Sequence, residues 1–387
     1  MLDSLKTCYN CVFFIVLQFA FLLFLFLFFH AQNDVLAYVL SYALGHYVAP
    51  SPWLIALGLT AVLVLLGWGT EKLMKRCCVH TAKLWSCVLL AWLSVAGISW
   101  LFVAWHYQLG LVLGALVLGA LLHWLNGKEG FGKVKVATFY HTLTWAALQL
   151  LALCLFVGIG NGVTDLQHYE LRTAQALQSE HPKHAYKVGD KSFVTSHRLF
   201  AMRCYLLATT HKKGLADKIF EQMVPKGGAE NLLIPTDEKQ NLLFPASNLT
   251  QLLGCSRHAG EDVLTYLHRC AWLSAFRNGQ KRSAAIDYYL CALLLNRQLE
   301  RFSVEIMRFY PKEVDNGTLP TYYAQALMLY RRTCSQPTVL YEDNSVEANY
   351  QDYSDMADTL SDAAVRNNLL RRSYGETYWW WYSYGEH

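Results

Sequence analysis

Charged side chains are scarce in the first 163 residues of this chain, where four long stretches contain no Asp, Glu, Lys or Arg. The longest of these stretches, Leu84–Gly127, runs for 44 residues without a charge. A helix needs about 20 mostly apolar residues to cross the roughly 30 Å hydrocarbon core of a bilayer, and lipid cannot satisfy the amides of an irregular backbone. The lack of charge therefore predicts a transmembrane domain over residues 1–163.

Motifs of catalysis and cofactor binding are missing as well. The chain has no His-Glu-x-x-His and no Gly-x-Ser-x-Gly sequence, and Gly227-Gly228 is not followed by the Lys-Ser or Lys-Thr of a phosphate loop. No carboxylate lies within a predicted span, which argues against an ion-coupled transporter. We therefore expect no cofactor, no metal ion and no catalytic residue, so that an enzyme is the less favoured function.

Regular cysteine spacing is a further missing feature. The residues after position 163 include five unevenly spaced cysteines, which are Cys204, Cys255, Cys270, Cys291 and Cys334. An odd number without a pattern does not indicate a disulfide framework, and isolated cysteines are commonly buried as small apolar side chains. We therefore expect most of these cysteines to be buried thiols, as in a compartment where disulfides rarely form.

Five spans account for the charge-free stretches. They are predicted near residues 12–29, 53–69, 84–104, 107–125 and 137–160. A cleaved signal peptide is the alternative for the first stretch, but Val12–Phe29 is long, aromatic and without an Ala-x-Ala exit. Val35–Val48 would be only about 21 Å long as a helix, so we predict a short interfacial or re-entrant helix there, with a sixth span as the alternative.

The basic residues of this domain predict its orientation, because short loops rich in Lys and Arg stay in the cytoplasm. They are Lys6, Lys72, Lys75, Arg76, Lys83, Lys128, Lys133 and Lys135. With five spans, all eight lie on one side of the bilayer. We therefore predict a multi-pass protein of the cytoplasmic (inner) membrane, with a cytoplasmic N-terminus and an extracytoplasmic C-terminal domain.

One pair of small residues predicts how two spans pack. Gly110 and Gly114 form a Gly-x-x-x-Gly sequence in the predicted span 107–125. Such pairs let two helices approach closely in lipid, although glycine is also common in membrane helices generally. We predict that these two glycines mediate helix packing.

The residues from 164 onward have a balanced charge and a helical pattern. Their 25 basic and 25 acidic residues give no net charge, which argues against nucleic-acid binding. Apolar residues recur at helical spacing in Gly214–Met223, Ser283–Leu295, Leu299–Tyr310 and Thr321–Arg332. Helical pairs joined by short turns are typical of tetratricopeptide-type solenoids, so residues 164–336 are predicted to form such a domain, with an irregular all-α domain as the alternative.

Residues 337–387 form an acidic segment and an aromatic tail. The acidic segment is expected to become helical by Met356–Arg371. The aromatic cluster that follows is Tyr378, Trp379, Trp380, Trp381 and Tyr382. Exposed Tyr and Trp mark protein interfaces or the lipid headgroup layer, so these five residues are candidates for a partner or membrane contact. The alternative is that the tail folds back as a cap over the preceding helices.

Three segments carry a resemblance to a known family: Arg203–Gln222, Ala285–Arg332 and the ending after Tyr374-Gly375-Glu376-Thr377-Tyr378-Trp379. Together they resemble a family of uncharacterised bacterial multi-pass membrane proteins, defined as a domain of unknown function. The resemblance covers the second half best and the spans only in general layout. It implies an all-α protein with a membrane bundle and a helical-repeat domain, and it implies no catalytic residues.

These observations favour a membrane scaffold or interaction protein that presents an extracytoplasmic helical domain to a protein or peptide partner. A concave groove lined by Tyr, Arg and Asn would support this function. The alternative is a membrane enzyme or transporter, with a site between the spans and the outer domain. That site would need convergent polar groups, for which the candidates are His46, His106, Asn161 and Asp165.

Overall fold

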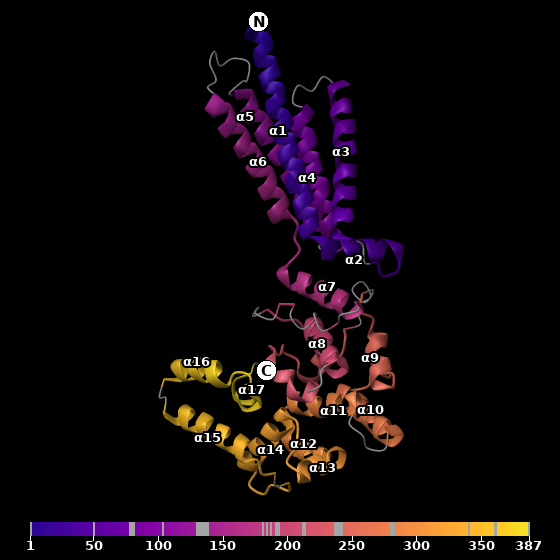
Figure 1. The fold of residues 1–387 in the computed structure, drawn as a ribbon, viewed down its shortest axis with the longest axis vertical. Coiled ribbons are helices and arrows are strands. Elements are labelled where there is room, and N and C mark those ends of the chain that lie inside the picture. The colour runs from indigo at the N-terminus through magenta and orange to yellow at the C-terminus, as the bar shows by residue number, and fades with distance from the viewer. Residues whose placement is uncertain are drawn as a thin grey trace. The chain divides into compact units, whose positions relative to one another are not determined.

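The computed structural model describes residues 2–48, 51–76, 82–102, 104–128, 139–179, 182, 185, 188–189, 194–210, 214–235, 243–278, 283–339, 341–359 and 362–385. The chain divides into two compact units, Met1–His168 and Tyr169–His387. The described residues form α-helices and 3-10 turns and no strand, which confirms the all-α fold class (Figure 1).

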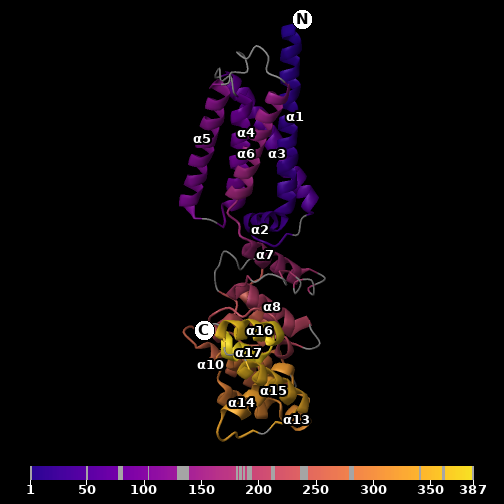
Figure 2. The same cartoon turned by 90° about the vertical axis from the view of Figure 1, so that its left-hand side faces the viewer.

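The first unit is a bundle of five long helices with a short helix at one end (Figures 1 and 2). The long helices are α1 (Leu2–Ala31), α3 (Pro52–Arg76), α4 (Ala82–Ser99), α5 (Trp105–Lys128) and α6 (Phe139–Gly160). Successive long helices run in opposite directions, so the end of α3 lies beside the N-terminal end of the unit (Figure 1). The short helix α2 (Asn33–Leu44) is bent by 73° from the last part of α1.

Two of these helices are long and apolar enough to cross a membrane by themselves, within Pro52–Arg76 and Trp105–Trp124. Two bent pairs, α1 with α2 and α6 with α7 (Asp165–Gln178), raise the number of candidate spans to four if each pair is one span. The five-span count remains a prediction. Lys133 and Lys135, and the first two residues of the predicted span 137–160, lie outside the described residues.

Helix α3 shows why a bilayer is the expected surroundings of this unit. Ala56, Leu63 and Gly67 are its buried residues, whereas Trp53 and Leu65 are 60% and 68% exposed. A helix that is apolar all round and exposed on most sides would be poorly solvated by water. In lipid the same side chains meet hydrocarbon, so their exposure within the chain costs nothing.

Glycine allows close helix packing in this unit at Gly119. A Cβ built on Gly119 of α5 would collide with the ring of Trp85 on α4. A Cβ on Gly114 would meet only Phe156 at an ordinary 3.5 Å, and one on Gly110 would meet nothing within 4 Å. Gly119 is therefore a closely packed glycine of the described chain, and helix packing through Gly110 and Gly114 remains a prediction.

Substituting Gly119 with alanine is expected to destabilise the first unit by about 1–3 kcal/mol, the usual cost of overpacking. The matched control is Gly110→Ala on the same helix, where the added methyl group meets open space. Thermal unfolding of both variants in the same detergent checks the difference. Equal melting temperatures would contradict the packing of α5 on α4 at this glycine.

The second unit is built around α11 (Ala284–Leu295), and every residue of this helix after Ala284 is buried. Helices α10 (Val263–Asn278) and α12 (Leu299–Phe309) pack on it, as do α8, α9 and the 3-10 turns η2 and η4. The buried carboxylate of Asp287 accepts hydrogen bonds from the hydroxyls of Tyr310 at 2.6 Å and Tyr323 at 3.1 Å. These bonds satisfy a charge that would otherwise be costly to bury.

Other elements complete this unit. They are α8 (His197–Thr210), η2 (Leu215–Asp217), η3 (Ile219–Glu221), η4 (Gly228–Leu232), α9 (Ala246–Leu253), α13 (Pro311–Asp315), α14 (Thr321–Thr333), α15 (Asn344–Thr359), α16 (Ala363–Tyr374) and α17 (Tyr378–Tyr384). In a solenoid each repeat contacts only its neighbours. Here α11 is a central helix with many partners, and no tetratricopeptide repeat is identified among the described helices.

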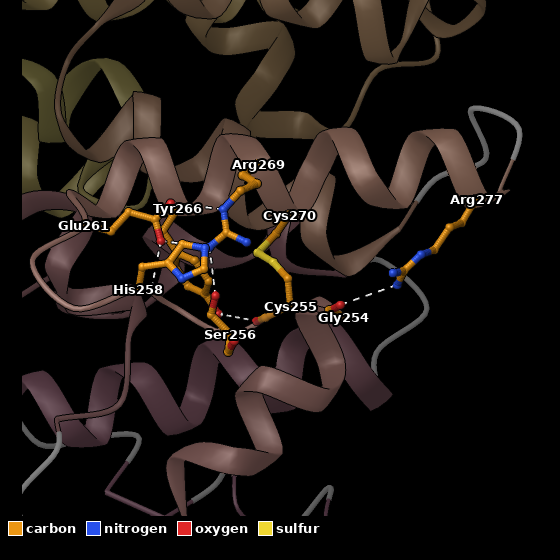
Figure 3. The surroundings of a disulfide bond; sticks show 9 residues. All are labelled: Gly254, Cys255, Ser256, His258, Glu261, Tyr266, Arg269, Cys270 and Arg277. Atoms are coloured by element: carbon orange, nitrogen blue, oxygen red, sulfur yellow. Dashed lines mark hydrogen bonds and ion pairs between the residues drawn. A yellow bond between two sulfur atoms is a disulfide. The ribbon is translucent and has the colours of Figure 1, made fainter.

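Two of the five cysteines after position 163 are paired: Cys255 and Cys270 form a disulfide with a Cα–Cα distance of 5.9 Å (Figure 3). It ties the residues after α9 to the middle of α10. Sequence spacing could not reveal the pair, because the fold brings together two positions that follow no motif. Cys204 and Cys291 are buried, as expected for most cysteines of this region.

An ion pair reinforces this closed loop. The Arg269 guanidinium donates to both oxygens of Glu261, at 3.0 and 2.8 Å, and also to the carbonyl of Ser256 (Figure 3). The bonds from Arg269, together with the backbone N–H of His258, hold the pKa of Glu261 at about 2. The carboxylate therefore stays charged, and the loop stays tied, at any pH well above 2.

Candidate functional site

A pocket of about 1020 Å³ opens in the second unit, between η2–η3, α14 and the C-terminal helices α16 and α17. Its lining residues are Asp217, Phe220, Glu221, Gln222, Met223, Val224, Thr321, Tyr322, Gln325, Asn367, Asn368, Arg371, Arg372, Ser373, Tyr374, Gly375, Glu376, Thr377, Trp380, Trp381, Tyr384 and Gly385. Volumes of roughly 300–1,000 Å³ are typical of small-molecule sites, so this pocket has room for a large small molecule or a short peptide segment. It contains the Tyr, Arg and Asn side chains expected of a partner-binding groove.

The pocket exists because the aromatic tail folds back onto α14. The side chain of Gln325 accepts a hydrogen bond from the backbone N–H of Tyr378 at 2.7 Å, and the hydroxyl of Tyr322 donates to the carbonyl of Glu376 at 3.0 Å. The hydroxyl of Tyr378 reaches further, to the carbonyl of Leu294 at the end of α11. Thr377 caps α17 by accepting from Trp380 N, which sets the start of this last helix.

A cluster of aromatic rings forms the floor beneath these bonds. Phe220 of η3 lies with its ring centroid 5.0 Å from Tyr322, 5.1 Å from Tyr378 and 4.9 Å from Trp381. Such tilted and edge-on contacts add to the burial of each ring. Residues Gly214–Met223 were predicted to be helical, but this stretch forms two 3-10 turns. Asp217 there accepts from the backbone and hydroxyl of Thr321, which fixes the turns against α14.

Arg297, in the turn after α11, holds the end of the tail. Its guanidinium donates to the carbonyls of Trp381 at 3.2 Å and Gly385 at 3.0 Å. The same group lies 4.9 Å from the centre of the Trp381 ring and 5.7 Å from that of Tyr382. The backbone of Arg297 has a φ of 55°, a conformation that costs a non-glycine residue about 1–2 kcal/mol.

Replacing Arg297 with alanine is expected to loosen α17 and destabilise the second unit by about 1.5–3 kcal/mol, the range for hydrogen bonds to a charged group. Replacing it with glycine removes the same bonds but suits the positive φ, so Arg297→Gly should be less destabilised by roughly 1 kcal/mol. Hydrogen exchange of the α17 amides in the full chain measures both effects. Exchange unchanged in Arg297→Ala would contradict this role.

The other face of α17 completes a small second core. Trp379 is 1% exposed and packs with Tyr353 of α15 and Leu370 of α16. The ring centroid of Trp379 lies 5.5 Å from that of Tyr350 and 6.1 Å from that of Tyr353. The range Met356–Arg371, which was predicted to be helical, covers the end of α15 and most of α16. Asp362 caps the second by accepting from the backbone N–H of Ala364.

The pocket walls carry charge of both signs. Arg371 and Arg372 on α16 are exposed, and Asp217, Glu221 and Glu376 contribute carboxylates from other walls. Glu221 also pairs with Lys218 at 2.7 Å. Mixed charges beside aromatic rings suit a ligand that has both charged and apolar groups, as a peptide does.

The five aromatic residues predicted to contact a partner or membrane divide between core and pocket. Tyr378, Trp379 and Trp381 are buried against the rest of the unit, so their surface is taken up by packing inside the chain. Trp380 and Tyr382 are half-buried, and Trp380 lines the pocket beside Tyr384, with ring centroids 6.1 Å apart. A partner or membrane contact at this tail remains a prediction, and Trp380 and Trp381 both line the pocket.

The polar residues of the alternative membrane site are not brought together in the described chain. The His46 ring bonds to the carbonyl of Leu44, and Asn161 bonds to Gly158. His106 and Asp165 are exposed. None of the four is bonded to another of the set.

A partly buried pair in the first unit is not indicated by the sequence. Asp34 of α2 is 3% exposed, and its carboxylate lies 2.7 Å from Nδ1 of His168. The two residues are 134 positions apart. No motif joins them, so the sequence carries no signal of the pair. It fixes the start of α7 to α2.

Comparison with known families gives one match. Residues 261–385 match the model of a family of unknown function (DUF6057). No curated protein and no solved structure matches the chain.

This match confirms the resemblance to a family of unknown function for the helices from α10 onward, whereas the segment Arg203–Gln222 lies before the matched region. The DUF6057 region begins just before α10 and ends within the last described residues of the tail. It contains Arg297 and the α14, α16 and α17 walls of the pocket, whereas Asp217 and Phe220 lie before it. The first unit also lies outside the matched region.

Proposed function

We propose that this protein is an integral membrane interaction protein whose helical second unit lies outside the cytoplasmic membrane and binds a protein or peptide partner in the pocket beside α17. The pocket carries the proposal, because it combines aromatic rings, charges of both signs and room for a peptide segment. We also propose that the helical pairs of the second unit are related to tetratricopeptide repeats.

Two independent observations support the proposed side of the membrane. Lys72, Lys75 and Arg76 end α3 at the N-terminal end of the bundle, which is the cytoplasmic end by the positive-inside rule (Figure 1). The disulfide between Cys255 and Cys270 supports an extracytoplasmic second unit, because disulfides persist in oxidising compartments and are rare in the cytosol. An outer face is where such a domain would meet partners of the cell envelope.

Recognition is expected to centre on Trp380 and the two arginines of α16. Trp and Arg carry a large share of binding energy at protein interfaces, and loss of one such residue commonly costs at least about 2 kcal/mol, or roughly thirtyfold in affinity. Trp380 is half-buried and Arg372 is exposed in the pocket. A peptide with an aromatic or aliphatic anchor next to an acidic residue would meet both.

Site-specific photocrosslinking tests the proposal in cells that make the full chain. A crosslinking amino acid at Tyr384, which lines the pocket, should form a specific adduct with an envelope protein, and the adduct should disappear in Arg372→Ala. The matched control is the same crosslinker at Asp355, exposed on α15 and away from the pocket lining. Adducts that are identical at both positions, or none at Tyr384, would contradict a partner in the pocket.

A further inference from the structure

A second surface of the Tyr169–His387 unit is unusually apolar for a face in contact with water. Phe276 on α10 is 89% exposed, the largest value among the exposed large hydrophobic residues of the described chain. Trp272 and Leu273 are exposed on the same helix, and Val304 and Met307 are exposed on α12. We call these five residues the α10–α12 patch. Contiguous apolar surface of this kind marks an interaction site.

The two helices of the patch are in contact through Trp272, which meets two side chains of α12. The Arg308 guanidinium of α12 lies 5.0 Å from the centre of the Trp272 ring, and Phe309 packs edge-on to the same ring. Trp272 Nε1 donates to the His268 ring at 2.7 Å, so the polar group of the indole is already satisfied. The α10 side of the patch therefore presents hydrocarbon and ring faces to its surroundings.

Exposed charge around the patch is mainly positive. Arg277 follows Phe276, and Arg301 and Arg308 lie on α12 beside the rings of Tyr289 and Trp272. Glu305 is buried and is paired with Arg308 at 3.2 Å, which leaves Glu300 as the exposed carboxylate of α12. Burial lowers the pKa of His268, with Arg301 and Arg308 acting in the same direction, so its ring adds no charge at neutral pH.

We infer that the α10–α12 patch docks on the surface of an anionic bilayer. Phe and Trp at its centre suit the boundary between headgroups and acyl chains, and arginines at its edge can bind lipid phosphates while their stems cover apolar surface. The candidate spans of the same chain keep a bilayer close, so even weak docking is populated through a high effective concentration. The partner pocket beside α17 shares no residue with the patch, so the two proposals are independent.

Hydroxyl-radical footprinting of the full chain in nanodiscs tests this inference. The protein is placed in phosphatidylcholine alone or in phosphatidylcholine with phosphatidylglycerol, and oxidation is read residue by residue. Oxidation of Trp272, Phe276 and Met307 is expected to fall severalfold in the anionic nanodisc. Met223, which is 48% exposed elsewhere in the same unit, is the internal control and should be oxidised equally in both.

Charge variants distinguish lipid docking from other contacts. The protection of the patch from oxidation gives the ratio of docked to undocked protein. Arg301→Gln and Arg308→Gln should each lower this ratio by about fivefold, whereas Arg332→Gln on α14 should leave it unchanged. Equal oxidation of the patch in both nanodiscs would overturn the inference. Protection that is independent of phosphatidylglycerol but rises with protein concentration would also overturn it, because it would indicate contact with a second copy.

Discussion

Replacement of Trp379 with alanine is expected to destabilise the helices α15–α17 by about 3–5 kcal/mol, the usual cost of removing a buried Trp side chain. Trp379 is 1% exposed and is the largest side chain in the small core that it shares with Tyr353 and Leu370. Its loss leaves a cavity that three short helices cannot close. The pocket beside α17 should be lost together with the tail.

The matched control is Trp380→Ala, one position along the same helix. Trp380 is half-buried and faces the pocket, so its loss should cost only about 1–2 kcal/mol of stability while it weakens partner binding. Hydrogen exchange of α15–α17 in the full chain measures both variants. If Trp379→Ala left hydrogen exchange unchanged and abolished only partner binding, Trp379 would be a contact residue. The interpretation that α17 packs as a cap on the preceding helices would then be wrong.

Removal of the disulfide is the second large effect. Cys255 and Cys270 close a loop with a sequence separation of 15, for which the chain-entropy model gives about 3 kcal/mol of stabilisation. The double variant Cys255→Ser/Cys270→Ser should lose this amount in denaturant unfolding of the second unit. A reductant should bring the parent protein to the same stability and leave the double variant unaffected.

Cys334→Ser is the control for this experiment, because Cys334 is a free, half-buried thiol. It should change stability by less than about 0.5 kcal/mol, as surface substitutions usually do. Alkylation of the unfolded, unreduced protein gives a direct readout, since Cys255 and Cys270 should resist the reagent. Modification of both before reduction would show that the bond is absent.

Local patterns in the sequence predicted much of the second unit. Ser283–Leu295 is observed as α11 from Ala284 to Leu295, and Thr321–Arg332 as α14 from Thr321 to Thr333. A Ser N-cap and a proline before the first turn are short-range signals, so they are visible in the sequence. The helix predicted for Gly214–Met223 is not observed. The conformation of this stretch depends on Asp217, which bonds to Thr321 more than a hundred residues away.

The candidate site was only partly predictable for the same reason. The aromatic tail was recognisable as unusual, but the sequence did not decide between an exposed contact and a cap. That choice depends on Gln325 and Arg297, whose polar groups meet the backbone of the tail only in the folded unit. The disulfide and the pair of Asp34 with His168 are also long-range contacts that no spacing rule encodes.

The sidedness of the two units is the most direct test of the central claim. Single reporter cysteines are placed at Asp355, exposed in the second unit, and at Lys75, exposed at the basic end of the membrane unit. Cells are treated with a membrane-impermeant maleimide before and after lysis, with the unsubstituted chain as background. The account predicts that Asp355→Cys is labelled in cells with an intact cytoplasmic membrane and that Lys75→Cys is labelled only after lysis. Labelling of Lys75→Cys in intact cells, with Asp355→Cys protected until lysis, would contradict it.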